Sequence, residues 1–95
     1  MIGVKNPRFA LGQVVATPGA LEALERAGQT AWELVARHVQ GDFGEVDAED
    51  RQANEDAIQH GERILSSYTL RTGEKIWVIT EADRSSSVVL RPEDY

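Results

Sequence analysis

The spacing of apolar residues changes along the chain, and this change constrains the fold more than any other feature. Before residue 63, apolar side chains recur at helical spacing, which indicates helices packed on a core. From Ile64 onward they alternate with polar side chains, as in strands that bury one face. Helices followed by strands are typical of the α+β class, in which the helices pack on one face of a sheet.

The second half of the chain predicts three consecutive antiparallel strands. Residues 64–80 read as a β-hairpin with a turn around Gly73. A polar link at residues 81–86 leads to a third strand at 87–90, which Pro92 ends.

Three helices are predicted in the first half from their end signals. Thr17, Thr30 and Asp47 are suited to the N-cap position, where a side-chain oxygen accepts a hydrogen bond from the first helical turn. Gly28 and Gly61 can adopt the left-handed conformation that ends a helix. Gly41 is predicted to close the second helix, so each helix has a predicted beginning and end.

Together these elements predict one α+β domain spanning residues 1–95. We expect two to three N-terminal helices packed on a three- to four-stranded antiparallel sheet with a C-terminal meander. A fourth strand would come from residues 9–16. Trp32 is predicted to face the core. The strand that contains Trp77 is apolar on both faces, so we expect helices on one face and a loop or a second subunit on the other.

The composition restricts the classes of function. The chain has no cysteine, which excludes a disulfide framework, a zinc ribbon and a thiol nucleophile. We expect a cytoplasmic protein, because a chain without disulfides suits a reducing compartment and no signal-peptide or membrane-spanning pattern is evident.

The net charge of −6 is concentrated in the middle of the chain. In residues 41–62, Arg51 alone opposes a run of acidic side chains, namely Asp42, Glu45, Asp47, Glu49, Asp50, Glu55, Asp56 and Glu62. Such a surface repels phosphate, which disfavours direct nucleic-acid binding through it. A solvated helix face explains the charges, and an acidic nucleic-acid mimic that inhibits a host defence enzyme is the alternative.

The polar link at residues 81–86 is the first candidate binding site. Asp83 is explained by turn chemistry. Arg84 has no comparable explanation, and its guanidinium is suited to a carboxylate or a phosphate. The structural alternative is that it pairs with an acid (Glu81, Asp83 or Asp42). The candidate residues in this link are Asp83, Arg84, Ser85 and Ser86.

A second candidate region surrounds Phe43, which lies between two glycines and beside acidic residues. We predict that Phe43 anchors its loop in the core, because an aromatic ring buries a large apolar area. The alternative is an exposed recognition residue. Asp42 belongs to the same loop, and Asn54, one turn into the third helix, is predicted to reach back to it.

No motif predicts catalysis, a metal ligand set or a cofactor. His38 and Asp42 are four residues apart, but Gly41 is expected to break the helix between them, so His38 is predicted to be a hydrogen-bonded structural residue. The serines lack a nucleophile elbow, and the glycines do not form a phosphate-binding loop.

Three stretches, FALGQVVATPGALEALERAG, HVQGDFGEVDAEDRQAN and IWVITEADRSSSVVLRPEDY, resemble a family of small uncharacterised bacterial proteins. Members of this family are plasmid-related or associated with mobile elements. The similarity runs from Phe9 to Tyr95, although the family typically has tryptophan at the position of Phe43 and threonine in the region of Ser86 and Ser87. The resemblance implies a bacterial or mobile-element setting and assigns no catalytic residue.

These observations favour a non-catalytic accessory factor of a plasmid or mobile element that binds another protein. They leave a homodimer open and give no reason to expect a membrane partner. The alternative is a small enzyme or ligand-binding domain directed at nucleotides or RNA, which would act through Arg84, His38 and the hydroxyls of Ser85 and Ser86.

Overall fold

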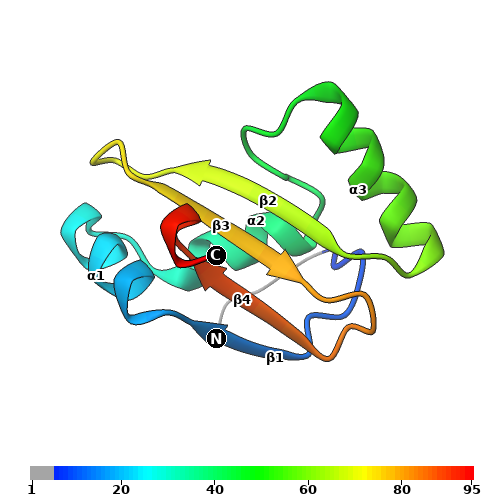
Figure 1. Cartoon of the computed structure of the whole chain (residues 1–95), viewed down its shortest axis with the longest axis horizontal. Helices are drawn as coiled ribbons and strands as arrows, with labels where there is room; N and C mark the ends of the chain where they lie inside the picture. Colours follow the sequence, from blue (N-terminus) through cyan, green and yellow to red (C-terminus); the bar gives the residue numbers. More distant parts are fainter. Residues whose placement is uncertain (1–5) are drawn as a thin grey trace.

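The computed structural model describes residues 6–95, which form three α-helices, four β-strands and a short C-terminal 3₁₀ helix (Figure 1). The elements in chain order are β1 (Gln13–Ala16), α1 (Pro18–Ala27), α2 (Ala31–Val39), α3 (Ala48–His60), β2 (Ile64–Thr69), β3 (Lys75–Thr80), β4 (Ser86–Leu90) and η1 (Pro92–Asp94). The predicted α+β class is confirmed.

The strands form one sheet in the order β1-β4-β3-β2. The β2–β3 and β3–β4 pairs are antiparallel, as predicted for the meander. The prediction of a wholly antiparallel sheet is wrong at β1, which runs parallel to β4 with Val15 opposite Val88. Hairpin turns impose antiparallel pairing, whereas β1 and β4 are separated in the chain by the three α-helices and by β2 and β3. Because β1 precedes α1, the helices do not all come before the strands.

The predicted helix caps are present. Thr17 Oγ1 accepts a hydrogen bond from the Ala20 N–H at 3.1 Å, and Asp47 Oδ1 accepts one from the Asp50 N–H at 2.8 Å. Thr30 caps α2 in the same way with a longer bond of 3.4 Å to the Glu33 N–H. Gly28 and Gly61 end α1 and α3 in the left-handed conformation. These local signals fix where each helix begins and where α1 and α3 end.

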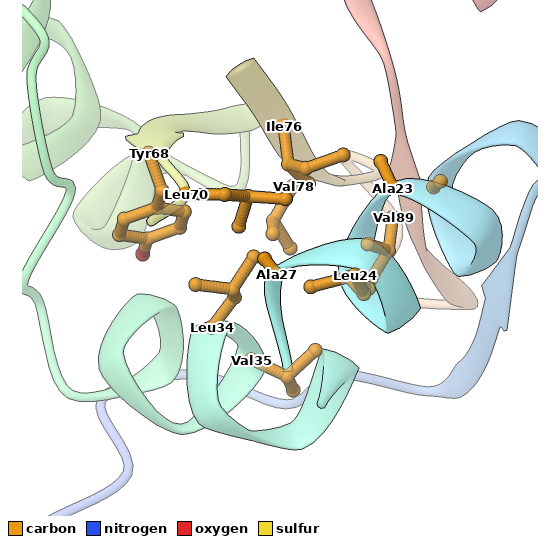
Figure 2. Close-up of a cluster of buried hydrophobic side chains, with 11 residues drawn as sticks. Ala23, Leu24, Ala27, Leu34, Val35, Tyr68, Leu70, Ile76, Val78 and Val89 are labelled. Carbon is orange, nitrogen blue, oxygen red and sulfur yellow. The ribbon is translucent and has the colours of Figure 1, made fainter. Parts of the chain in front are cut away.

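The main core lies between the sheet and helices α1 and α2 (Figure 2). Alternate residues of the strands point toward the helices, so Ile76 and Val78 of β3 share this face with Val89 of β4. They meet the buried stripe of the two helices, which contains Ala20, Ala23, Leu24, Ala27, Leu34 and Val35. Burying each large side chain contributes roughly 1.5–3 kcal/mol.

The prediction that Trp32 lies in the core is wrong, because its side chain is 51% exposed. The buried stripe of α2 consists of Leu34, Val35, His38 and Val39, and Trp32 lies to one side of it. The apolar residues of α2 do recur at helical spacing, as predicted. That spacing is compatible with burial of either of two neighbouring faces of the helix, and tertiary packing buries the face that carries His38.

A smaller core lies beside the edge of the sheet, under α3. Phe43, Val46, Ala57 and Ile64 are buried there, with Phe9 packed against them. Phe43 is 2% exposed, as expected for an anchor of its loop. Helix α3 lies beside β2 and not over the centre of the sheet (Figure 1).

Candidate functional site

The face of the sheet opposite α1 and α2 is only partly covered, and we call it the open face. Residues paired across neighbouring strands point to the same face, so the strand register defines four rows of side chains on it. The first row runs across the sheet through Leu65, Ile79, Val88 and Val15. The second contains Ser67, Trp77 and Leu90. The other two rows pair Thr69 with Lys75 and Ser86 with Gln13. Because Ile79 and Leu90 are buried, the accessible apolar part of this face consists of Leu65, Trp77, Val88 and Val15.

The C-terminal residue covers part of this surface. The Tyr95 ring meets the Trp77 ring edge-on, with the ring centroids 5.9 Å apart. The guanidinium carbon of Arg63 lies 5.5 Å from the Tyr95 centroid, within cation–π range. Tyr95 is nevertheless 68% exposed and Trp77 is half-buried, so both rings are accessible. The expectation that the strand of Trp77 is covered on both faces is met only in part: helices cover one face, and the C-terminal residue covers part of the other.

A network at Asp94 holds the C-terminal segment in place. Thr17 Oγ1 donates to Asp94 Oδ2 at 2.7 Å, and Arg91 Nη2 donates to Asp94 Oδ1 at 2.7 Å. Arg91 first, and then Thr17, hold the pKa of the Asp94 carboxyl well below its usual range. The segment is thereby tied to the start of α1, which positions Tyr95 against Trp77.

Arg63 supplies the positive charge of the open face. Its side chain is exposed, and within residues 6–95 no acidic group lies within ion-pairing distance of it. Arg37 and Lys75, by contrast, are engaged by Asp42 and Glu45. The Arg63 guanidinium can therefore donate hydrogen bonds to a carboxylate while its flat face remains against Tyr95.

A chain of buried hydrogen bonds passes through His38, whose side chain is fully buried. His38 Nδ1 lies 2.6 Å from Ser66 Oγ, and Nε2 lies 2.9 Å from Thr80 Oγ1. Thr80 in turn contacts Ser87 Oγ at 2.7 Å, and Ser87 donates to the Leu11 carbonyl at 2.8 Å.

The last hydrogen bond of this network, from Ser87 to Leu11, determines which group is the donor in each of the others. The Ser87 hydroxyl donates its one hydrogen to the Leu11 carbonyl, which can only accept. In the contact between Thr80 and Ser87, Thr80 must therefore be the donor. Thr80 then accepts from the His38 Nε2–H, and Ser66 donates to Nδ1. Burial lowers the pKa of His38 from 6.5 to about 4, so the ring is neutral at pH 7. His38 is the structural residue that the sequence predicted, although its partners are hydroxyls and not Asp42.

Arg84 is engaged by backbone carbonyls, and not by the acids considered in the sequence. Its guanidinium donates to Glu62 O at 2.6 Å and Ala57 O at 2.9 Å, at the C-terminal end of α3. Longer bonds reach the carbonyls of Glu81 and Ala82. A cation is favourable near the negative, C-terminal end of a helix, so Arg84 connects the link to α3.

The rest of the link forms a tight turn. Asp83 Oδ1 accepts a hydrogen bond from the Ser85 N–H at 3.0 Å, which is the predicted turn chemistry. The Glu81 N–H donates to the Ser86 carbonyl and closes the link. Arg84 has a φ of +60°, a left-handed conformation that is unfavourable for a residue with a side chain.

The second predicted region is also held by internal contacts. Asp42 forms a 2.6 Å ion pair with Arg37, and its Oδ1 accepts from the Gly44 N–H. Asn54 does not reach back to this loop: its side chain donates to Leu65 O and accepts from Leu65 N–H at 2.8 and 3.1 Å. Helix α3 places Asn54 beside the edge of β2, where its amide replaces a neighbouring strand.

The predicted residues therefore do not converge on one site. Arg84 of the link binds the end of α3, Asn54 binds the edge of β2, and Phe43 is buried in the smaller core. Their role in ligand binding stays a prediction. The cluster of Arg63, Trp77 and Tyr95 was not proposed from the sequence. Strand alternation places Arg63 and Leu65 on one face, but only the tertiary structure brings Tyr95 to it.

Comparison with known protein families, with curated proteins and with solved structures finds no match for this chain. The resemblance to plasmid-related proteins accordingly stays a prediction. Within the described residues, no helix has the length and apolarity needed to cross a membrane. The same part of the chain contains no cluster of three or more acidic or histidine side chains arranged to hold a metal ion.

Proposed function

We propose that this chain is a protein-binding module and that the open face is its recognition surface. The observation that carries the proposal is the cluster of Arg63, Trp77 and Tyr95 on the face of the sheet not packed against α1 and α2. Tryptophan, tyrosine and arginine are the residues most enriched among those that dominate the energetics of protein interfaces.

The chemistry of this surface defines the partner. Trp77 and Tyr95 form an apolar surface continued by Leu65 and Val88, which suits an aromatic or branched aliphatic side chain of the partner. Arg63 suits a carboxylate beside that side chain. In the setting that the sequence resemblance implies, such a module would act as an accessory factor of a plasmid or mobile element.

The alternative of a nucleotide- or RNA-directed enzyme receives less support. His38 is fully buried within its hydroxyl network, and Arg84 already donates to carbonyl groups. The acidic-mimic alternative is weakened because basic side chains neutralise part of the acidic run: Arg37 pairs with Asp42, Lys75 with Glu45 and Arg8 with Glu55.

Site-specific photocrosslinking tests the proposal. A photoreactive phenylalanine analogue replaces Tyr95, and the matched control carries it at Leu21, which is 52% exposed on α1. In cells of the native host, we expect position 95 to form one discrete adduct with another protein that position 21 does not form. Arg63→Glu should abolish that adduct, because it opposes the carboxylate of the partner. The same adducts from both positions, or none from position 95, would contradict the proposal.

A further inference from the structure

The two edge strands of the sheet differ in whether their outward backbone groups have hydrogen-bond partners. At the β2 edge, the Asn54 side chain satisfies both backbone groups of Leu65. At the next outward residue, the Ser67 N–H donates to the Phe43 carbonyl, and the Ser67 carbonyl accepts from the Glu45 N–H. This edge is therefore closed by a side chain and by a loop, as is common where an exposed strand would otherwise pair with another chain.

At the opposite edge, β1 presents backbone groups outward. The N–H groups of Gln13 and Thr17 donate to Ser85 O and Val89 O, toward β4. Because successive backbone groups of a strand alternate in direction, those of Val14 and Ala16 point away from the sheet. Within residues 6–95, no loop, cap or side-chain hydrogen bond reaches them.

The side chains of β1 do not discourage pairing. The strand reads Gln-Val-Val-Ala and contains neither a charge nor a proline, the usual means of protecting an edge. Val15 is 43% exposed on the open face. An accessible, uncharged strand edge with unused donors and acceptors is a template for another strand.

We propose that β1 pairs with β1 of a second copy of this chain, in antiparallel orientation, about a two-fold axis at Val15. In this register the outward groups of Val14 face those of Ala16 in the other copy, and the N–H and C=O of each are satisfied reciprocally. Val15 meets its own counterpart on the open face, as a close pair without hydrogen bonds.

A second copy suits this edge because β1 carries no charge, so antiparallel self-pairing places no like charges opposite each other. The exposed Val15 side chains of the two copies also meet at the two-fold axis and cover each other. The pairing extends the sheet across both protomers and leaves their open faces on the same side. Because a four-residue strand is short, we expect a weak, concentration-dependent dimer with a small interface.

Cysteine crosslinking tests the register directly, since the chain has no cysteine of its own. Directly opposed residues of such a pair have Cα atoms about 4.5 Å apart, within the range that a disulfide spans. Under mild oxidation, Val15→Cys should therefore form a linked dimer at least ~10-fold faster than the control Leu21→Cys, whose leucine is 52% exposed on α1. Equal rates would overturn the proposal.

Sedimentation equilibrium supplies the second test. The unmodified chain should dimerise as its concentration rises toward about 1 mM, and Val15→Lys, which brings like charges together at the axis, should raise the dimer dissociation constant at least ~10-fold. Ala16→Pro should do the same, because it removes an outward donor and leaves the ladder to β4 intact. A wild-type chain that stays monomeric, or a dimer unaffected by both changes, would overturn the proposal.

Discussion

Replacing Arg84 with alanine should lower the free energy of unfolding by about 2 kcal/mol. The two short bonds, to Glu62 O at 2.6 Å and Ala57 O at 2.9 Å, carry most of this effect. A hydrogen bond from a charged donor contributes roughly 1.5–3 kcal/mol when buried, and we take about 1 kcal/mol for each because Arg84 is half-buried and water competes. The loss should exceed the usual surface effect of about 0.5 kcal/mol.

Glycine at the same position separates the two roles of Arg84. The φ of +60° at Arg84 costs a residue with a side chain roughly 1–2 kcal/mol, and glycine avoids this cost. Arg84→Gly should therefore lose about 1 kcal/mol less than Arg84→Ala. Arg84→Lys should lie between wild type and alanine, because an ammonium group can reach one of the carbonyls but not several together.

Equilibrium urea denaturation of the four proteins, followed by circular dichroism, measures this series. Arg51→Ala is the control, since Arg51 is exposed on α3, and it should change the stability by less than about 0.5 kcal/mol. The reasoning is refuted if Arg84→Ala is as stable as wild type, or if Arg84→Gly is less stable than Arg84→Ala.

Three further predictions concern the His38 network, the closed sheet edge and the acidic surface. Between pH 6.5 and about 4 the unfolded His38 binds a proton that the folded ring does not, so stability should fall by about 3 kcal/mol as the pH is lowered through this interval. Urea denaturation across it should show this loss in wild type and not in His38→Gln. Asn54→Ala should lower the free energy of unfolding by about 2–3 kcal/mol, because it leaves the Leu65 N–H and C=O without partners. The control Gln52→Ala, on the exposed side of α3, should leave the denaturation midpoint unchanged. Equal effects of the two changes would contradict the role of Asn54. Glutamine at Glu49, Asp56 and Glu62 together should leave the thermal unfolding transition in place, because exposed charges contribute little singly, and a variant that fails to fold would make these charges structural.

The parts of the fold that the sequence predicted well are local. Thr17, Thr30 and Asp47 cap their helices through residues three positions away, and the β2–β3 hairpin is joined by its own turn. Their structure therefore depends on neighbours that a reader of the sequence can see. The parallel pairing of β1 with β4 joins residues far apart in the chain, and no short pattern distinguishes it from an antiparallel pair.

The candidate site shows the same division. Asp83 forms the expected turn because its partner is two residues away. The arginine beside it was expected to face a ligand or an acid, and its carbonyl partners on α3 become evident only when the helix is placed against the link. Tyr95 reaches Trp77 because Asp94 binds Thr17, a contact across almost the whole chain.

The two tryptophans allow the most direct test of recognition by the open face. Trp77 lies on that face, while Trp32 is 51% exposed on α2, on the other side of the sheet. Each has one indole N–H, and the two signals are separately observed by ¹H–¹⁵N NMR, with Trp32→Phe providing the assignment. When the protein crosslinked at position 95 is titrated in, the Trp77 signal should shift or broaden and the Trp32 signal should remain in place. A shift of Trp32 alone, or an unchanged Trp77 signal at saturation, would contradict the account.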